Sequence, residues 1–224
     1  MMLHIPAVID TAQLKIMQTA LQQADFVDGR LSAGPTARQV KHNQELDPGG
    51  RIASDLGKIM VGNLYNNETF RKAALPYRIA APLFARYDKS MHYGEHIDDP
   101  VMGGDTQRFR CDLAVTLFLN DPQDYQGGEL VVRTPFGEQR CKFPAGDIVL
   151  YPASSLHQVA AIESGQRLVG VAWVQSMVRD PAKREILYDL ANARDQLAGD
   201  ETQADAFSQV DHAYTNLVRM WAEV

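Results

Sequence analysis

The chain has 224 residues, a formal net charge of −6, and 45% hydrophobic and 22% charged residues, with a pI near 5.5. These values are typical of a soluble globular protein with one domain, or with one domain and a small appendage. The acidic balance leaves no broad basic surface for a phosphate backbone, so we expect no nucleic-acid partner.

No targeting or membrane signal is visible in the sequence. The N-terminal stretch MMLHIPAVID lacks a basic region followed by a long apolar run, and no apolar segment approaches the roughly 18 to 20 residues of a membrane span. The two cysteines, Cys111 and Cys141, stand far apart and form no CxxC pattern, which favours reduced core thiols over a disulfide. We therefore predict a cytoplasmic protein without membrane contact.

The first zone of the chain, about residues 10–75, is predicted to be mainly helical. Asp10 is suited to an N-cap, and Leu14, Met17 and Leu21 follow it at helical spacing. A second helical pattern runs from about Ile52 to Tyr65.

The middle zone, about residues 76–177, changes to short β-rich runs separated by Gly, Pro and other turn residues. The runs are PLFARY, YGEHID, DLAVTLFL, ELVVRT, QRCKF, DIVLYP, HQVAAI and RLVGVAWVQ. Many short strands with this punctuation indicate a sandwich or a barrel. The sequence therefore predicts an α+β protein with a mainly β core.

Helical spacing returns after Asp180 in KREILYDLANARDQLAG and again in the segment that ends YTNLVRMW. Its apolar residues are expected to form helix faces buried on the β core, with an oligomer interface as the alternative. These residues are Ile186, Leu187, Leu190, Tyr214, Leu217 and Trp221. We predict a domain over residues 1–177 and a helical extension over residues 178–224.

Residues 86–99, RYDKSMHYGEHIDD, concentrate side chains that can bind a metal. On a strand, residues i and i+2 point to the same face and residue i+1 points away. His96 and Asp98 therefore form the candidate pair, whereas Asp99 is expected to face away as a solvated or turn-forming carboxylate. His92 has the parity of His96, but Gly94 and the start of the strand leave its direction open.

A second histidine and an arginine extend this pair later in the β zone. Two histidines and one carboxylate on one face of iron leave three coordination positions open, as in non-haem Fe(II) oxygenases. His157 follows a strand and a turn, and Arg167 begins another apolar strand ten residues later. A guanidinium can hold a carboxylate through two parallel hydrogen bonds. Taken singly, a core or surface histidine and a solvated arginine explain these residues; the ordered set favours a metal and oxoacid site.

The ordered motifs resemble a known family. HID at 96–98, GGELVV at 127–132, FPAGDIVLYPASSLHQV at 143–159, and Arg167 with Trp173 are similar to the Fe(II)/2-oxoglutarate dioxygenases of the prolyl-4-hydroxylase type. More closely, they resemble the bacterial PKHD-type hydroxylases, including the PiuC-like proteins associated with iron uptake. The resemblance covers nearly the whole chain and implies a double-stranded β-helix, or jelly roll, with N-terminal helices and a C-terminal helical extension.

The resemblance also assigns roles to residues. It implies that His96, Asp98 and His157 are catalytic iron ligands and that Arg167 forms a salt bridge with the distal carboxylate of 2-oxoglutarate. It implies hydroxylation of an unidentified substrate with dioxygen, release of succinate and CO2, and L-ascorbate (vitamin C) as reductant. Homo-oligomers are compatible with the family.

One position departs from the prolyl-hydroxylase pattern. Those enzymes often place a tyrosine on the strand that corresponds to DLAVTLFLN, where this chain has Thr116 and Phe118. Tyr87 is the substitute that we assign provisionally to the oxoacid. Gly127 and Gly128 are interpreted as a tight entry to the next strand, and Trp173 as core packing behind the site.

Two rival functions stay open at this point. A cupin-like metalloenzyme with non-oxidative chemistry would use the same fold without Arg167 and usually with a third histidine. A non-catalytic sensor would bind iron and 2-oxoglutarate only as ligands. The substrate itself depends on loops such as DPVMGGDTQRFR, at residues 99–110, whose shape the sequence does not give.

Overall fold

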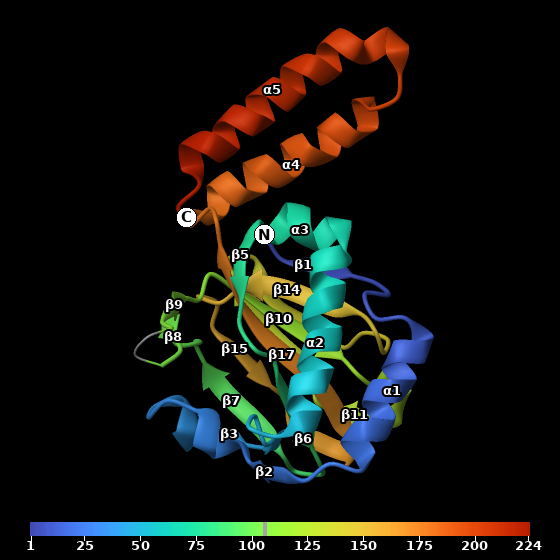
Figure 1. Ribbon diagram of the computed structural model, residues 1–224. Helices are drawn as coiled ribbons and strands as arrows, with labels where there is room; N and C mark the ends of the chain where they lie inside the picture. Colours follow the sequence, from blue (N-terminus) through green and yellow to red (C-terminus); the bar gives the residue numbers. More distant parts are fainter. Residues whose placement is uncertain (105–106) are drawn as a thin grey trace.

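A computed structural model that describes residues 1–104 and 107–224 contains two large antiparallel sheets, two small two-stranded ribbons and five α-helices. The larger sheet has eight strands, with the order β1-β14-β10-β17-β6-β4-β2 and β5 paired to β17. Its strands are β1 (Leu3–Ile5), β2 (Phe26–Asp28), β4 (Gln44–Leu46), β5 (Pro76–Ile79), β6 (Leu83–Tyr87), β10 (Leu113–Phe118), β14 (Ile148–Pro152) and β17 (Arg167–Ser176). Figure 1 shows this sheet behind helix α2.

The smaller sheet has five strands in the order β13-β12-β15-β7-β3. They are β3 (Lys41–His42), β7 (His92–His96), β12 (Leu130–Thr134), β13 (Gly137–Cys141) and β15 (His157–Val159). Two small ribbons complete the β structure: β8 (Val101–Met102) with β9 (Phe109–Arg110), and β11 (Tyr125–Gly127) with β16 (Ile162–Gly165). Every β-run predicted from the sequence overlaps an observed strand, and the double-stranded β-helix is confirmed.

Strand β10 explains why the core has two layers. Leu113, Val115 and Leu117 pack in one apolar cluster with residues of the helices, whereas Ala114 and Phe118 pack in a second cluster with residues of β12 and β15. The strand is thus buried on both faces, and this is why DLAVTLFL reads as a continuous apolar run rather than an alternating one.

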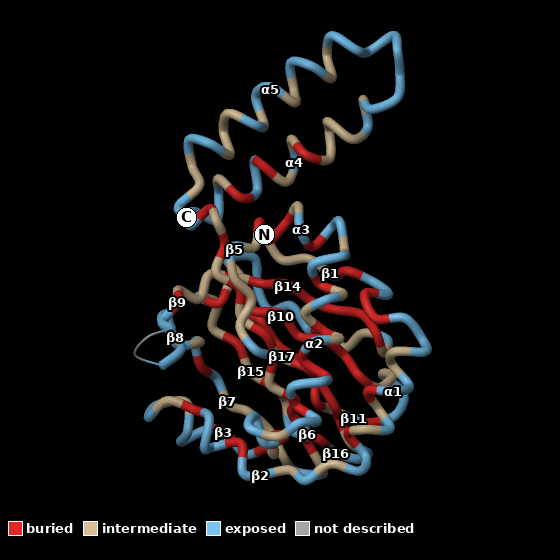
Figure 2. The backbone as a smooth tube through the Cα atoms, viewed as in Figure 1, coloured by how far each residue is buried: buried red, intermediate tan, exposed pale blue. Residues whose placement is uncertain are grey.

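The helices of the first zone cover the outer face of the larger sheet. They are α1 (Thr11–Gln22), α2 (Arg51–Asn66) and α3 (Glu68–Ala74), and the Asp10 carboxylate accepts from the backbone N–H of Gln13 at 2.8 Å as the predicted N-cap. The buried backbone in Figure 2 runs through the sheets and the helix faces that contact them.

The first zone is mainly helical as predicted, but it also contains short strands that the sequence did not predict. Residues 3–46 also supply β1, β2, β3 and β4, which pair at the edges of both sheets. These strands are only two or three residues long. An alternating pattern cannot show in so short a segment, because the strands form through pairing with the core.

The C-terminal helices α4 (Pro181–Leu197) and α5 (Ala204–Trp221) form a hairpin that projects from the β core (Figures 1 and 2). The prediction that their apolar faces are buried on the barrel was wrong. Leu187 is fully buried in a small separate cluster with Leu75 and Val178, whereas Ile186 is 48% exposed and no residue of α5 is fully buried. Within the described residues, no helix is long and apolar enough to cross a membrane.

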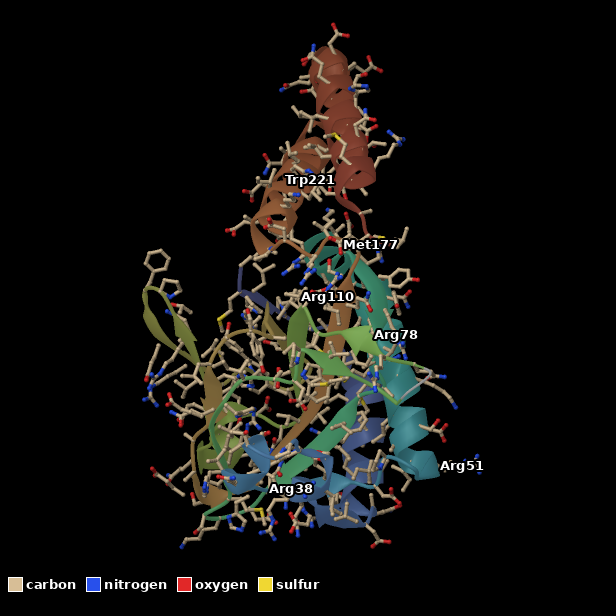
Figure 3. All side chains as sticks on the ribbon, turned by 90° about the vertical axis from the view of Figure 1, so that its left-hand side faces the viewer. Arg38, Arg51, Arg78, Arg110, Met177 and Trp221 are labelled. Atoms are coloured by element: carbon tan, nitrogen blue, oxygen red, sulfur yellow. The ribbon has the colours of Figure 1, made fainter. Side chains whose placement is uncertain are left out.

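The end of the chain returns to the core beside this cluster. Arg110 donates to the Glu223 carboxylate at 3.0 Å, to the Asp112 carboxylate at 2.7 Å and to the Ser176 carbonyl at 3.1 Å. Figure 3 places Arg110, Met177 and Trp221 around the base of the hairpin.

Leu187→Ala should destabilise the protein by about 2–5 kcal/mol, because it removes a fully buried side chain from the cluster that anchors the hairpin. The neighbouring Ile186→Ala is the control and should cost under about 1 kcal/mol, since Ile186 is half exposed. Urea unfolding measures both values. Equal costs would mean that the hairpin is not anchored through Leu187.

Candidate active site

A cavity of about 420 Å³ opens between the two sheets. The larger sheet contributes Tyr87, Thr116 and Arg167 to its wall, and the smaller sheet contributes His96 and His157. Residues far apart in the sequence thus meet in one space because facing strands of a β-helix enclose it.

The three predicted metal ligands lie together in this cavity. His157 opens β15 directly opposite His96, the last residue of β7, and the centres of the two imidazole rings are 4.2 Å apart. The Asp98 Oδ1 atom is 3.8 Å from His157 Nε2. One ligand atom from each of the three residues lies within 4.8 Å of the others, and the Asp98 side chain is almost fully buried.

Backbone carbonyls fix both imidazoles in the same way. His96 Nδ1 is 2.8 Å from the Gly94 carbonyl oxygen, and His157 Nδ1 is 2.9 Å from the Ser155 carbonyl oxygen. Each Nδ1 therefore carries the proton and donates, which leaves each Nε2 lone pair for a metal. Both partners lie two residues before the histidine, a relation that the sequence alone did not reveal.

The electrostatics of this cluster favour neutral imidazole. Burial, together with the charge that His157 can carry, lowers the pKa of His96 to about 3. Burial also raises the pKa of Asp98, against the opposing influence of His157 and of the Trp173 N–H. Among the described residues, Asp98 Oδ2 has no hydrogen-bond partner. A divalent cation would relieve the burial of this carboxylate, so the cluster suits a metal.

Arg167 faces the same cavity from β17 without a counter-charge. It is only 1% exposed, its Nε and Nη1 atoms have no hydrogen-bond partner, and no salt bridge to it occurs within residues 1–104 and 107–224. The rings of Tyr87 and Phe118 lie 5.1 and 6.0 Å from its guanidinium carbon. A buried cation in this state has a strong requirement for an anion.

Comparison with known proteins identifies the family. Residues 82–175 match the 2OG-Fe(II) oxygenase superfamily, and residues 181–223 match the PKHD-type hydroxylase C-terminal domain. A PKHD-type hydroxylase of Thioalkalivibrio sulfidiphilus is 50% identical over 224 residues, which is 100% of both chains. The chain belongs to the PKHD-type hydroxylases. A further member from Synechococcus elongatus is 45% identical over 223 residues, again 100% of both chains.

Solved structures of other oxygenases share the fold of this PKHD-type chain. A prolyl-4-hydroxylase of Pseudomonas putida is 17% identical with a TM-score of 0.56, over 78% of this chain and 92% of that one. A Trichoplax adhaerens prolyl hydroxylase in complex with a hypoxia inducible factor peptide fragment is 16% identical with a TM-score of 0.54, over 83% and 86%. The family is one of 2-oxoglutarate–Fe(II) oxygenases, so its cofactor is Fe(II) and its cosubstrate is 2-oxoglutarate.

Several strands contribute hydroxyl groups to the cavity that Arg167 faces. Tyr87 is 3% exposed, and burial raises its pKa to about 12, so its hydroxyl stays protonated. Thr116 also lines the cavity. Tyr151 of β14 lies there as well, buried and close to the Thr116 hydroxyl. Sequence reasoning missed Tyr151, although its place six residues before His157 on a predicted strand was a usable signal.

Other predicted residues take different places. His92 lies outside this cavity, in edge contact with His42 at 5.7 Å. Asp99 is exposed and stands outside the three-residue cluster, yet it lines the cavity mouth opposite Gly34. Trp173 packs against the inter-sheet apolar cluster as predicted, and it also lines the cavity next to Asp98.

A buried ion pair was also missed. Lys41 of β3 and Glu45 of β4 bridge the two sheets on the cavity wall, and Lys41 donates to the Ser32 hydroxyl at 2.9 Å. The Lys41 ammonium lies 5.1 Å from the ring centre of Tyr93, and Tyr93 stacks on His96 at 3.6 Å. Tyr93 therefore separates this charge pair from the metal-binding cluster.

The free energy of unfolding of metal-free protein should fall with acid partly through His96. Between its ordinary pKa of 6.5 and its folded pKa of about 3, the unfolded chain takes up a proton at His96 and the folded chain does not. The loss amounts to at most about 1.4 kcal/mol per pH unit and is complete below that range.

His96→Gln should consequently lose less stability than wild type between pH 6.5 and pH 4.5, as measured by urea unfolding in chelator. His92→Gln, a change on the same strand outside the cavity, is the control and should follow wild type. Parallel profiles for all three proteins would contradict the low pKa of His96.

Proposed function

We propose that this PKHD-type chain is a hydroxylase that uses Fe(II), 2-oxoglutarate and dioxygen and releases succinate and CO2. The observation that supports it most directly is the buried, unpaired Arg167 in the same cavity as a cluster of two histidines and one carboxylate. The cluster provides the metal position and the arginine provides the anion position. A dicarboxylate with a keto group at one end fits this combination.

The residues present fit iron as a cofactor. His96 and His157 would hold it through Nε2, and Asp98 would hold it through its unpartnered carboxylate oxygen. Imidazole with carboxylate on one face is the donor set of non-haem Fe(II) oxygenases. Bound iron supplies the redox chemistry by which dioxygen reacts with the oxoacid.

The remaining roles belong to side chains of the chain itself. Arg167 would bind the distal carboxylate of 2-oxoglutarate, with Tyr87 or Thr116 as a hydroxyl donor beside it. The Gly94 and Ser155 carbonyls would keep the imidazoles in the required tautomer. The apolar inter-sheet core excludes water from this end of the cavity. In the overall reaction, one oxygen atom of dioxygen enters succinate and the other enters the hydroxylated product.

For the substrate, we propose only a chemical class. Peptidyl residues, free amino acids and siderophore-like small molecules are the candidates, and the last would link the chain to iron acquisition. The predicted specificity loop at residues 99–110 contributes Val101, Met102 and Gly103 to the cavity mouth, while Asp105 and Thr106 lie outside the described residues. We further propose L-ascorbate as reductant, a cytoplasmic location, a homo-oligomeric state, and the division into residues 1–177 and 178–224.

A non-catalytic sensor would bind the same ligands as the hydroxylase. The response to oxygen distinguishes the two functions. Anaerobic protein with Fe(II) and 2-oxoglutarate should develop a visible charge-transfer absorption, and admission of oxygen should consume this absorption and yield succinate. The measurement is absorbance followed by succinate quantification, with protein lacking 2-oxoglutarate as the control. Absorption without succinate, even with cell extract as a substrate source, would favour the sensor. Absence of absorption would reject both.

Asp98→Ala should weaken Fe(II) binding by at least about 100-fold, because loss of a direct ligand exceeds the 10- to 100-fold effect of an outer-shell partner. Asp99→Ala removes the adjacent exposed carboxylate and should change the affinity by less than about threefold. Competition with a metal indicator under argon measures both constants. Equal losses would show that Asp99 takes part in holding the metal.

A further inference from the structure

Tyr125 has a buried hydroxyl with no partner. The residue opens β11, is 3% exposed, and its hydroxyl oxygen makes no hydrogen bond. The aromatic ring is already well packed, with the Lys142 ammonium 4.1 Å from its centre. An unpaired buried hydroxyl lowers the stability of the folded protein, and phenylalanine at this position would avoid this cost.

Gly128 brings Tyr125 against Arg167. A Cβ atom built on Gly128 would lie 3.1 Å from Tyr125 Cε2, 3.2 Å from Arg167 Cδ and 2.3 Å from Ile162 Cδ1. The tyrosine ring and the arginine stem therefore both lie beside Gly128, which has no side chain. Gly128 also has a φ of +70°, which glycine adopts without steric cost. The second glycine of the GGELVV motif therefore leaves room for both side chains and adopts the positive φ of this turn.

The electrostatics agree with this proximity. Burial raises the pKa of Tyr125, and the positive charge of the nearby Arg167 opposes the increase. The guanidinium itself has two unpartnered nitrogens, Nε and Nη1. Two N–H groups of Arg167 and the O–H group of Tyr125 therefore lie near one another, and none of them has a hydrogen-bond partner among the described residues.

We propose that Tyr125 is a positioning residue, whose hydroxyl orients the Arg167 guanidinium for the distal carboxylate of 2-oxoglutarate. A carboxylate offers about four lone-pair sites and can accept from adjacent N–H and O–H donors. A tyrosine hydroxyl can accept a hydrogen bond from the arginine and at the same time donate one to the carboxylate. This inference rests on the proposed function of Arg167. It adds a side chain that lies behind the cavity wall.

Two oxoacids and one conservative substitution test the role of Tyr125. The probes are 2-oxoglutarate and 2-oxopentanoate, which has a methyl group in place of the distal carboxylate. Tyr125→Phe should weaken 2-oxoglutarate binding to anaerobic Fe(II) protein about tenfold, equivalent to about 1.4 kcal/mol, and change 2-oxopentanoate binding by less than about twofold. Dissociation constants come from the charge-transfer absorption and, on the Zn(II)-loaded protein, from calorimetry. Fe(II) affinity without oxoacid should stay unchanged.

Thermal unfolding adds a readout that a purely structural role would not produce. Ligand-free Tyr125→Phe should melt at or above the wild-type temperature, because the unpaired hydroxyl is gone, while its stabilisation by 2-oxoglutarate should be smaller. Tyr214→Phe is the matched control: its ring lies 4.7 Å from the Arg194 guanidinium in the C-terminal hairpin, so it should bind both oxoacids as wild type does.

The outcomes separate this inference from the function on which it rests. Wild-type protein that binds neither oxoacid, or both equally, would reject the role proposed for Arg167 and this inference with it. A wild type that discriminates, beside a Tyr125→Phe protein that discriminates equally, would reject Tyr125 alone. Equal weakening for both oxoacids would show a general structural defect and would also reject Tyr125 as a positioning residue.

Discussion

The pairing of His96 with His157 across β7 and β15 is the constraint on which the site depends. Backbone hydrogen bonds of the sheet set the distance between the two imidazoles, so the proposed metal position is fixed by the register rather than by flexible side chains. A shift of one residue in either strand would turn the ring on that strand to the opposite face. The carbonyls of Gly94 and Ser155 then select the same tautomer in each histidine, and Asp98 completes the cluster just beyond the end of β7.

Function is concentrated where the protein leaves polar groups unsatisfied. The inter-sheet core is apolar and well packed, yet the cavity beside it contains a carboxylate with a free oxygen, a buried guanidinium and, behind it, a buried hydroxyl. Each of these lowers stability in isolation. Together they define two anchors of opposite sign, one for a cation and one for an anion. The oxygenase family to which the chain belongs uses a metal and a dicarboxylate of that kind.

Much of the fold was predictable because the core strands are long and strongly patterned. β10 and β17 read as apolar runs, and the His96/Asp98 pair follows from alternation along β7 even though that strand ends at His96. Short edge strands such as β3 carry no period of their own. Tyr125 and the Lys41–Glu45 pair could not be assigned, since their surroundings arise from contacts between strands that are distant in sequence. The hairpin was misplaced because an amphipathic pattern does not specify which surface covers it.

An anaerobic crystal structure with Mn(II), a redox-silent substitute for iron, and 2-oxoglutarate would test the central claim most directly, namely that one cavity holds a metal on His96, Asp98 and His157 and an oxoacid on Arg167. The account predicts Mn(II) bound by the two Nε2 atoms and the Asp98 carboxylate, with the keto end of the oxoacid on the metal and its distal carboxylate on the guanidinium. Metal bound without one of these three residues, or an oxoacid that leaves Arg167 unpaired, would contradict it.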